Sequence, residues 1–116
     1  HYTLRRIKEI KPDAKTGMLY ADGIIDPVKY ACDVVNADAM HPAGYNVLFP
    51  GFLEECAKRG RLLHVWTINE EKHMRQLCEA GADAIITNYP DLAKKVTEEY
   101  YYGKLQPELV QMIIDN

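Results

Sequence analysis

The stretch that decides the fold is His64-Val65-Trp66-Thr67-Ile68-Asn69-Glu70, followed after a helical segment by Gly81-Ala82-Asp83-Ala84-Ile85-Ile86-Thr87-Asn88-Tyr89-Pro90. Each part is a short run of apolar and β-branched residues that ends in polar side chains and then opens a helix. The two parts therefore predict a strand, a helix, a second strand and a second helix. In parallel α/β folds, polar side chains at the carboxyl ends of the strands build the site.

The same alternation runs through the rest of the chain. Strands are expected over residues 16–20, 37–41, 62–68 and 84–87, and apolar residues at helical spacing precede and separate them. Such alternation favours a parallel sheet with right-handed crossovers, which is an α/β fold. Pro90 and Asp91 open a fifth helix, which Tyr100-Tyr101-Tyr102-Gly103 is expected to break, and a last helix is expected to start at Gln106-Pro107.

Four parallel strands are too few to close a barrel, which needs eight. Alone, they leave two unpaired edges and one uncovered face, and such edges invite pairing with another chain. The strands nevertheless have the composition of strands buried on both sides, with little polar alternation at Met18, Leu19, Val65, Ile68, Ile85 and Ile86. We therefore expect residues 1–116 to form a single partial domain that something else completes.

Composition excludes several classes of function. The net charge of the 116 residues is −3, so the chain has no basic footprint for nucleic acid, and no apolar run is long enough to span a membrane. Serine is absent, which excludes a serine nucleophile. Cys32, Cys56 and Cys78 lack metal-binding spacing and are expected to be small buried hydrophobes, which favours a reducing compartment such as the cytoplasm.

Three residues at predicted strand ends are candidates for substrate binding: Trp66, His41 and Tyr20. Trp66 is either a packing residue or an apolar wall of a pocket, and in both cases its N–H needs a partner. His41 is either a structural histidine or a donor to a phosphate or sugar hydroxyl. The polar residues that follow the last two strands are expected mainly to cap helices: Asn69, Thr87 and Asn88.

The other histidines have weaker claims to a function. His64 is expected at the amino end of its strand, where a catalytic role is unusual, and His73 is expected to be solvated on a helix. Glu70 and Glu71 beside His73 favour the start of a helix over a metal site. No convergent set of carboxylates is visible in the sequence.

The two motifs together resemble one family. Residues 66–69 (WTIN) and 80–92 (AGADAIITNYPDL) are similar to the VWTVN and GVDGIITDYP signatures of the glycerophosphodiester phosphodiesterases, and the TGMLY and DAMHP strands also fit. The resemblance spans about residues 1 to 100. Asn88 stands where many members have Asp, and Ala84 where many have Gly.

The resemblance implies a TIM-like (β/α)8 barrel that cleaves glycerophosphodiesters to an alcohol and sn-glycerol 3-phosphate. It also implies a divalent metal, Mg²⁺ or Ca²⁺, with two histidines as general acid and base. Those groups lie in the first half of the family's barrel, in motifs such as HRG, ExD and HD, which do not occur here. The chain is thus expected to be the C-terminal half, with no catalytic or metal-binding residue, and inactive alone.

Other interpretations stay open. The parent enzyme can be a barrel phosphodiesterase of the phospholipase C type, or the chain can be a non-catalytic half-barrel that binds a partner. A truncation product without a function of its own is a third possibility. The expected partners are a glycerophosphodiester substrate and either the missing N-terminal half or a second copy of the chain.

Overall fold

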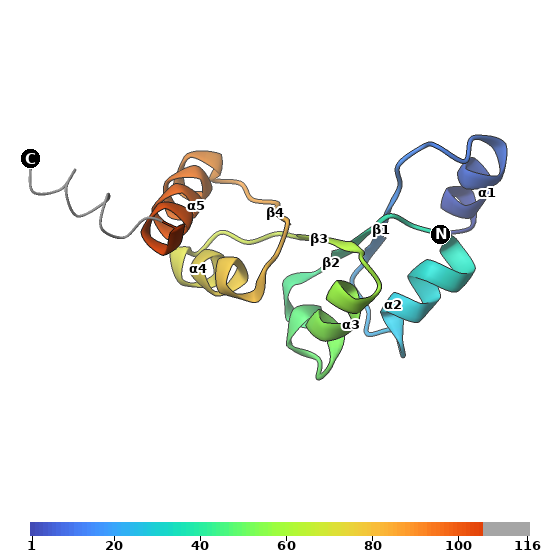
Figure 1. The fold of residues 1–116 in the computed structure, drawn as a ribbon, viewed down its shortest axis with the longest axis horizontal. Coiled ribbons are helices and arrows are strands. Elements are labelled where there is room, and N and C mark those ends of the chain that lie inside the picture. Colours follow the sequence, from blue (N-terminus) through green and yellow to red (C-terminus); the bar gives the residue numbers. More distant parts are fainter. Residues whose placement is uncertain (106–116) are drawn as a thin grey trace, which may run out of the picture.

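The computed structural model describes residues 1–105 and contains one four-stranded sheet with the strands in chain order (Figure 1). All neighbouring strands are parallel, as predicted. The strands are β1 (Gly17–Tyr20), β2 (Ala39–Pro42), β3 (Leu62–Val65) and β4 (Ala84–Ile85). The last two are shorter than predicted: after Val65 the chain keeps a bridge between Trp66 and Ala43 and a hydrogen bond from the N–H of Ile68 to the carbonyl of Ile86, but no continuous ladder.

Helices connect and flank the strands. They are α1 (Tyr2–Ile10), α2 (Pro27–Tyr30) continued by the π-helix η1 (Ala31–Val35), the 3-10 helix η2 (Gly44–Leu48), α3 (Phe52–Lys58), α4 (Glu71–Ala80) and α5 (Pro90–Leu105). The predicted break at Tyr100–Gly103 is wrong, since α5 runs through it; one glycine costs a helix only about 1 kcal/mol. The helix expected from Gln106 lies outside the described residues. Within residues 1–105, no helix is long and apolar enough to cross a membrane.

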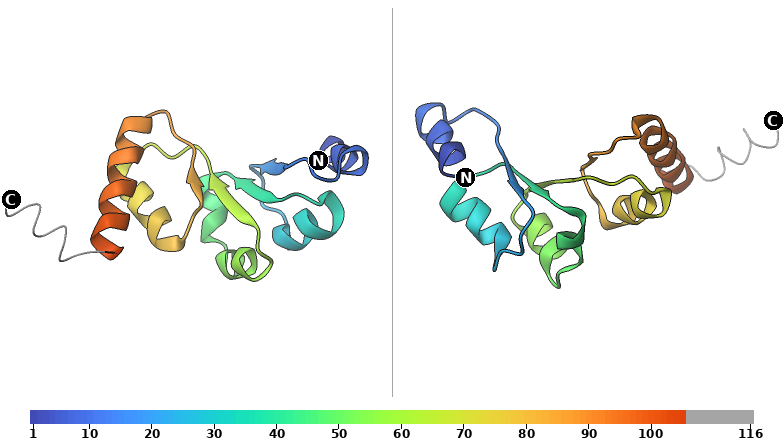
Figure 2. Two further views of the ribbon diagram at one scale, coloured as in Figure 1. Left: turned by 45° about the horizontal axis from the view of Figure 1, so that its top comes forward. Right: turned by 180° about the vertical axis from the view of Figure 1, so that it is seen from behind.

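The core lies on one face of the sheet. Successive side chains of a strand point to opposite faces, and Met18, Met40 and Val65 all point to the face that the helices cover, where each is fully buried. They belong to one cluster with the inward side chains of α2, α3 and α4, among them Val28, Phe52 and Met74. Figure 2 shows α2 and α3 together on this side of the sheet.

The other face of the sheet is open. Leu19 of β1 is 61% exposed, Leu62 of β3 is 48% exposed, and Ile86 just after β4 is 42% exposed. Within residues 1–105, β1 and β4 each have one unpaired edge. The two unpaired edges and the uncovered face agree with what the strand count predicts. Together with the parallel strand order, they are the architecture of part of a (β/α)8 barrel. We call this surface the interior face.

A partly buried ion pair ties α1 to the start of β2. Nζ of Lys8, which is 9% exposed, lies 3.0 Å from Oδ2 of Asp38, and the backbone N–H of Thr16 donates to the same oxygen at 2.8 Å. Burial alone would raise the pKa of Asp38, but the Thr16 N–H and the Lys8 ammonium outweigh it and lower that pKa below its ordinary value. The carboxylate therefore helps to hold the first helix on the sheet.

Asp38→Ala is expected to lower the free energy of unfolding by about 1–3 kcal/mol at pH 7, because it leaves the Lys8 ammonium without its carboxylate. A depressed pKa contributes stability above the ordinary value of about 3.9, and this stability is lost as the pH falls through the folded-state pKa. The difference between wild type and variant should thus shrink below pH 4 in urea titrations. Asp33→Ala, which removes the exposed ion pair with Arg59, is the matched control and should change stability much less than Asp38→Ala.

Candidate functional site

The predicted site residues Trp66 and His41 lie together on the interior face, near the carboxyl ends of β2 and β3. Nε1 of Trp66 donates to the carbonyl oxygen of His41 at 2.8 Å. The backbone of Trp66 is held too, because its carbonyl accepts from the N–H of Gly44 at 2.9 Å. The indole is only partly buried, and it lies at the strand ends where barrel enzymes bind their ligands.

Tyr20 lies elsewhere. It shares the helix-covered face with Met18 and is 6% exposed, within the core cluster. Burial raises the pKa of Tyr20 well above its usual range, and Cys56 adds to the effect. Among the described residues its hydroxyl has no hydrogen-bond partner. The expectation that Tyr20 contacts substrate thus has no support from its position, since the sequence alone did not reveal to which face it points.

His64 lies closer to the site than predicted. It is the third of the four residues of β3, beyond the amino end at which it was expected, and its Nδ1 lies 2.9 Å from Nε2 of His41. Burial lowers the pKa of His41, and the charge of a protonated His64 lowers it further. The signal in the sequence was the spacing to Trp66: residues two apart on a strand share a face.

Asn46 is a second residue that sequence reasoning missed. It is 2% exposed, and its Nδ2 donates to the carbonyl oxygen of Ala21 at 2.8 Å. The hydroxyl of Tyr45 donates to the same carbonyl. These bonds join η2, which follows β2, to the loop after β1 at the carboxyl ends of the strands.

Asn69 joins the next pair of loops. Its Oδ1 accepts from the N–H of Asn88 at 3.0 Å and from Oγ1 of Thr87 at 3.1 Å. Oγ1 of Thr87 in turn accepts from the N–H of Tyr89, one residue before α5. Asn69 was expected to cap α4, but the residue at that cap is Glu70, so the amide instead fixes the loop after β3 to the loop after β4.

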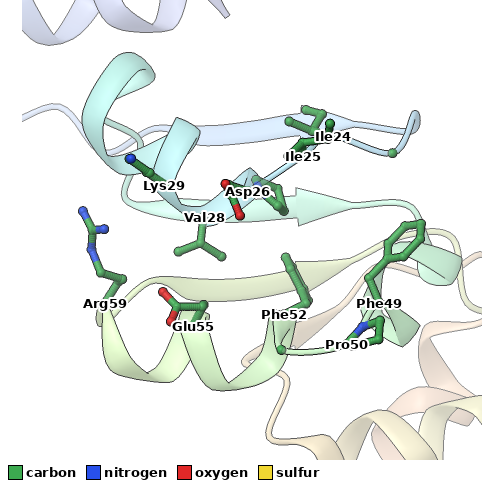
Figure 3. A pocket seen from close by; sticks show the side chains of 13 residues that line it. Ile24, Ile25, Asp26, Val28, Lys29, Phe49, Pro50, Phe52, Glu55 and Arg59 are labelled. Carbon is green, nitrogen blue, oxygen red and sulfur yellow. The ribbon is translucent and has the colours of Figure 1, made fainter.

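A groove in the described part of the chain lies outside this site. It has a volume of about 690 Å³ and runs between α2 and α3 on the helix-covered side (Figure 3). Val28 and Phe52 are buried beneath it, and Glu55 and Arg59 lie at one end. It is lined by neither Trp66 nor either histidine of the interior face.

The described residues do not fit a metal site or a thiol nucleophile. Within residues 1–105, no three His, Cys, Asp or Glu side chains lie close enough to hold a metal ion. All three cysteines are free, and burial raises the pKa of Cys56 to about 11, which keeps it a thiol at neutral pH. Cys56 and Cys78 are buried as predicted, whereas Cys32 is only partly buried and accepts from Nε of Arg61.

Sequence comparison identifies known proteins that this chain resembles. Residues 1–92 match the model of the Glycerophosphoryl diester phosphodiesterase family. The Glycerophosphodiester phosphodiesterase of Caldanaerobacter subterraneus subsp. tengcongensis is 36% identical over 91 residues, which are 78% of this chain and 37% of that protein. A Dermonecrotic toxin of Loxosceles gaucho is 30% identical over 98 residues, 84% of this chain and 31% of the toxin. The chain thus spans well under half the length of the relatives it matches.

Solved structures share the fold. A putative glycerophosphoryl diester phosphodiesterase from Silicibacter pomeroyi aligns with a TM-score of 0.73 at 20% identity, over 84% of this chain and 35% of that structure. A phosphodiesterase from Oleispira antarctica, in complex with the product sn-glycerol-3-phosphate, aligns with a TM-score of 0.73 at 17% identity, over 84% of this chain and 39% of that structure. At these identities the alignments show the fold alone.

Proposed function

Because the chain belongs to the Glycerophosphoryl diester phosphodiesterase family, we propose that it is the substrate-side half of a barrel that hydrolyses glycerophosphodiesters to an alcohol and sn-glycerol 3-phosphate. The observation that carries the proposal is the placement of Trp66 on the interior face, near the strand ends where barrel enzymes bind substrate. In this proposal, Trp66 is an apolar wall and His41 supports it from the neighbouring strand.

The acid, base and metal come from outside this chain in our proposal. Phosphodiester hydrolysis at useful rates needs a positioned proton donor and acceptor, and the family implies a divalent metal, Mg²⁺ or Ca²⁺. The donor atoms described above do not fit that ion. We therefore propose that the missing strands carry these groups and that the 116-residue chain alone is inactive.

A second candidate is a non-catalytic half-barrel that pairs with another copy of itself. The free edges of β1 and β4 and the bare interior face favour this alternative. It predicts a homodimer without metal affinity. A phospholipase C-type parent would differ from the main proposal in the head groups it accepts.

The test begins with the native and denatured masses of the purified protein. The chain is then assayed for release of sn-glycerol 3-phosphate from glycerophosphocholine, alone and fused to the part of the Caldanaerobacter relative that the match leaves uncovered. We expect metal-dependent turnover by the fusion and none by the chain, with the uncovered part alone as the control. Turnover by the chain would refute its inactivity, and an inactive fusion that folds and binds metal would refute the phosphodiesterase assignment.

A further inference from the structure

Two histidine rings meet on the interior face. Nε2 of His41 and Nδ1 of His64 are 2.9 Å apart, and the ring centroids are 4.7 Å apart at an interplanar angle of 48°. The parallel register of β2 and β3 puts Met40 beside Leu63, so the next residues of the two strands, His41 and His64, are neighbours. The contact is therefore a product of the sheet and not of a mobile loop.

A glycine on a third strand, β1, leaves space for the His41 ring. A Cβ atom at Gly17 of β1 would lie 2.4 Å from Nε2 of His41. Gly17 is paired with Ala39, two residues before His41, so the His41 ring leans over β1 and toward the amino ends of the strands. Any side chain at residue 17 would push the ring out of reach of His64.

His41 also contacts Trp66, the candidate wall of the substrate pocket. Its carbonyl oxygen accepts the indole N–H of Trp66 at 2.8 Å. His64 and Trp66 are two residues apart, so their side chains share the interior face. His41, His64 and Trp66 thus form one unit: the backbone from His64 to Trp66 joins two of its members, His64 contacts the His41 ring, and Trp66 donates to the His41 carbonyl.

We propose that His64 is a positioning residue for Trp66, which it orients through His41, and that it does so only while at most one of the two histidine rings is positively charged. A bond between two imidazoles needs one N–H and one free lone pair. When both rings are protonated, both facing nitrogens carry hydrogen, the bond is lost and the two charges repel. The significance of Trp66 for substrate rests on the proposed function, whereas the coupling within the unit does not.

One other imidazole reaches β1, because Nε2 of His1 lies 2.8 Å from the carbonyl oxygen of Leu19, whereas the titration proposed here is that of the His41–His64 pair. The neighbouring residues on β1 are Gly17 and Leu19, and Ala84 of β4 is paired with His64, so none of these three carries a charge. The two carboxylates nearest the amino ends of the strands are already engaged: Asp38 binds Lys8 and the Thr16 N–H, and Asp83 accepts from the N–H of Leu63 at 2.7 Å. Because burial and the other histidine lower the pKa of His41, the neutral ring prevails above the ordinary value of about 6.5. The bond between the His41 and His64 rings should therefore be lost as the pH falls below that value.

Trp66 reports on the unit directly, because it is the only tryptophan of the chain. Its fluorescence is recorded from pH 8 to pH 4.5, with far-UV circular dichroism to verify the fold. We expect a reversible change in emission below pH 6.5 in the wild type. His64→Gln, whose amide can still bond to His41 but does not titrate, should keep the emission of pH 8 throughout. Gly17→Ala should show the altered emission at every pH.

His73→Gln is the matched control, since it removes an exposed histidine of α4 and should leave the transition unchanged. An unchanged transition in His64→Gln would overturn the proposal. So would wild-type emission in a folded Gly17→Ala. His64→Gln keeps the test decisive if the glycine variant does not fold.

The active fusion adds a kinetic readout. His64→Phe, which removes the bond, should raise KM for glycerophosphocholine about tenfold at pH 8 with little change in kcat. His64→Gln should restore KM at pH 8 and flatten its rise at acid pH. An inactive fusion with the expected fluorescence would refute the proposed function and leave the positioning role intact. An active fusion with unchanged fluorescence in His64→Gln would refute the positioning role alone.

Discussion

Leu62→Glu is expected to leave the 116-residue chain folded and to cost a completed barrel about 3–5 kcal/mol of stability. Leu62 is 48% exposed on the interior face, so in the chain alone the carboxylate stays hydrated and the change should be about 0.5 kcal/mol or less. Once the strands of the fusion partner close over that face, we expect the same carboxylate to be buried without a partner. The two backgrounds should therefore differ by a factor of at least about 100 in the folding equilibrium.

The measurement is urea unfolding of the chain and of the fusion, each with and without the substitution. Val34→Glu is the matched control, because Val34 is 45% exposed but belongs to η1 on the helix-covered side. It should cost little in both backgrounds. Equal effects of Leu62→Glu in the two proteins would mean that the interior face is not covered by the added strands, and the half-barrel interpretation would fail.

Strand number and direction could be predicted from the sequence, because they depend on local patterns. Four apolar runs alternate with helical spacing, and such alternation permits few topologies. The ends of the strands were harder to predict. Residues 66–68 have strand-like side chains, yet beyond Val65 the pairing is reduced to the bridge from Trp66 to Ala43 and one hydrogen bond from the N–H of Ile68 to the carbonyl of Ile86. Pairing partners, not composition, decide where a strand ends.

The face of the sheet to which each side chain points could be predicted only in part. Trp66 and His41 lie near each other because strand ends gather at one edge of a parallel sheet. Tyr20 lies at the same edge but points into the core, and His64 points to the site from the middle of its strand. Each residue's face depends on the register of the whole strand, and a shift of one residue reverses it. Strands composed almost entirely of apolar residues carry no alternation from which that register can be inferred.

Trp66→Ala in the active fusion is expected to lower kcat/KM for glycerophosphocholine about 100-fold, which corresponds to about 2.7 kcal/mol. Two losses add up: the apolar wall that the indole offers to substrate, and the bond from Nε1 to the carbonyl of His41, which is left buried without a donor. If Trp66 binds substrate and transition state alike, most of the loss should appear as a higher KM.

Trp66→Phe separates the two losses, because phenylalanine keeps an apolar ring and lacks the donor. We expect it to retain most of the affinity and to lower kcat/KM about fivefold, as for the loss of one hydrogen bond. Phe49→Ala is the matched control, since Phe49 is a half-exposed aromatic residue that lines the groove between α2 and α3. It should leave the kinetics unchanged. Activity of Trp66→Ala within twofold of the wild type would show that the indole packs the sheet and does not contact the diester, and the substrate wall would then have to come from the missing strands.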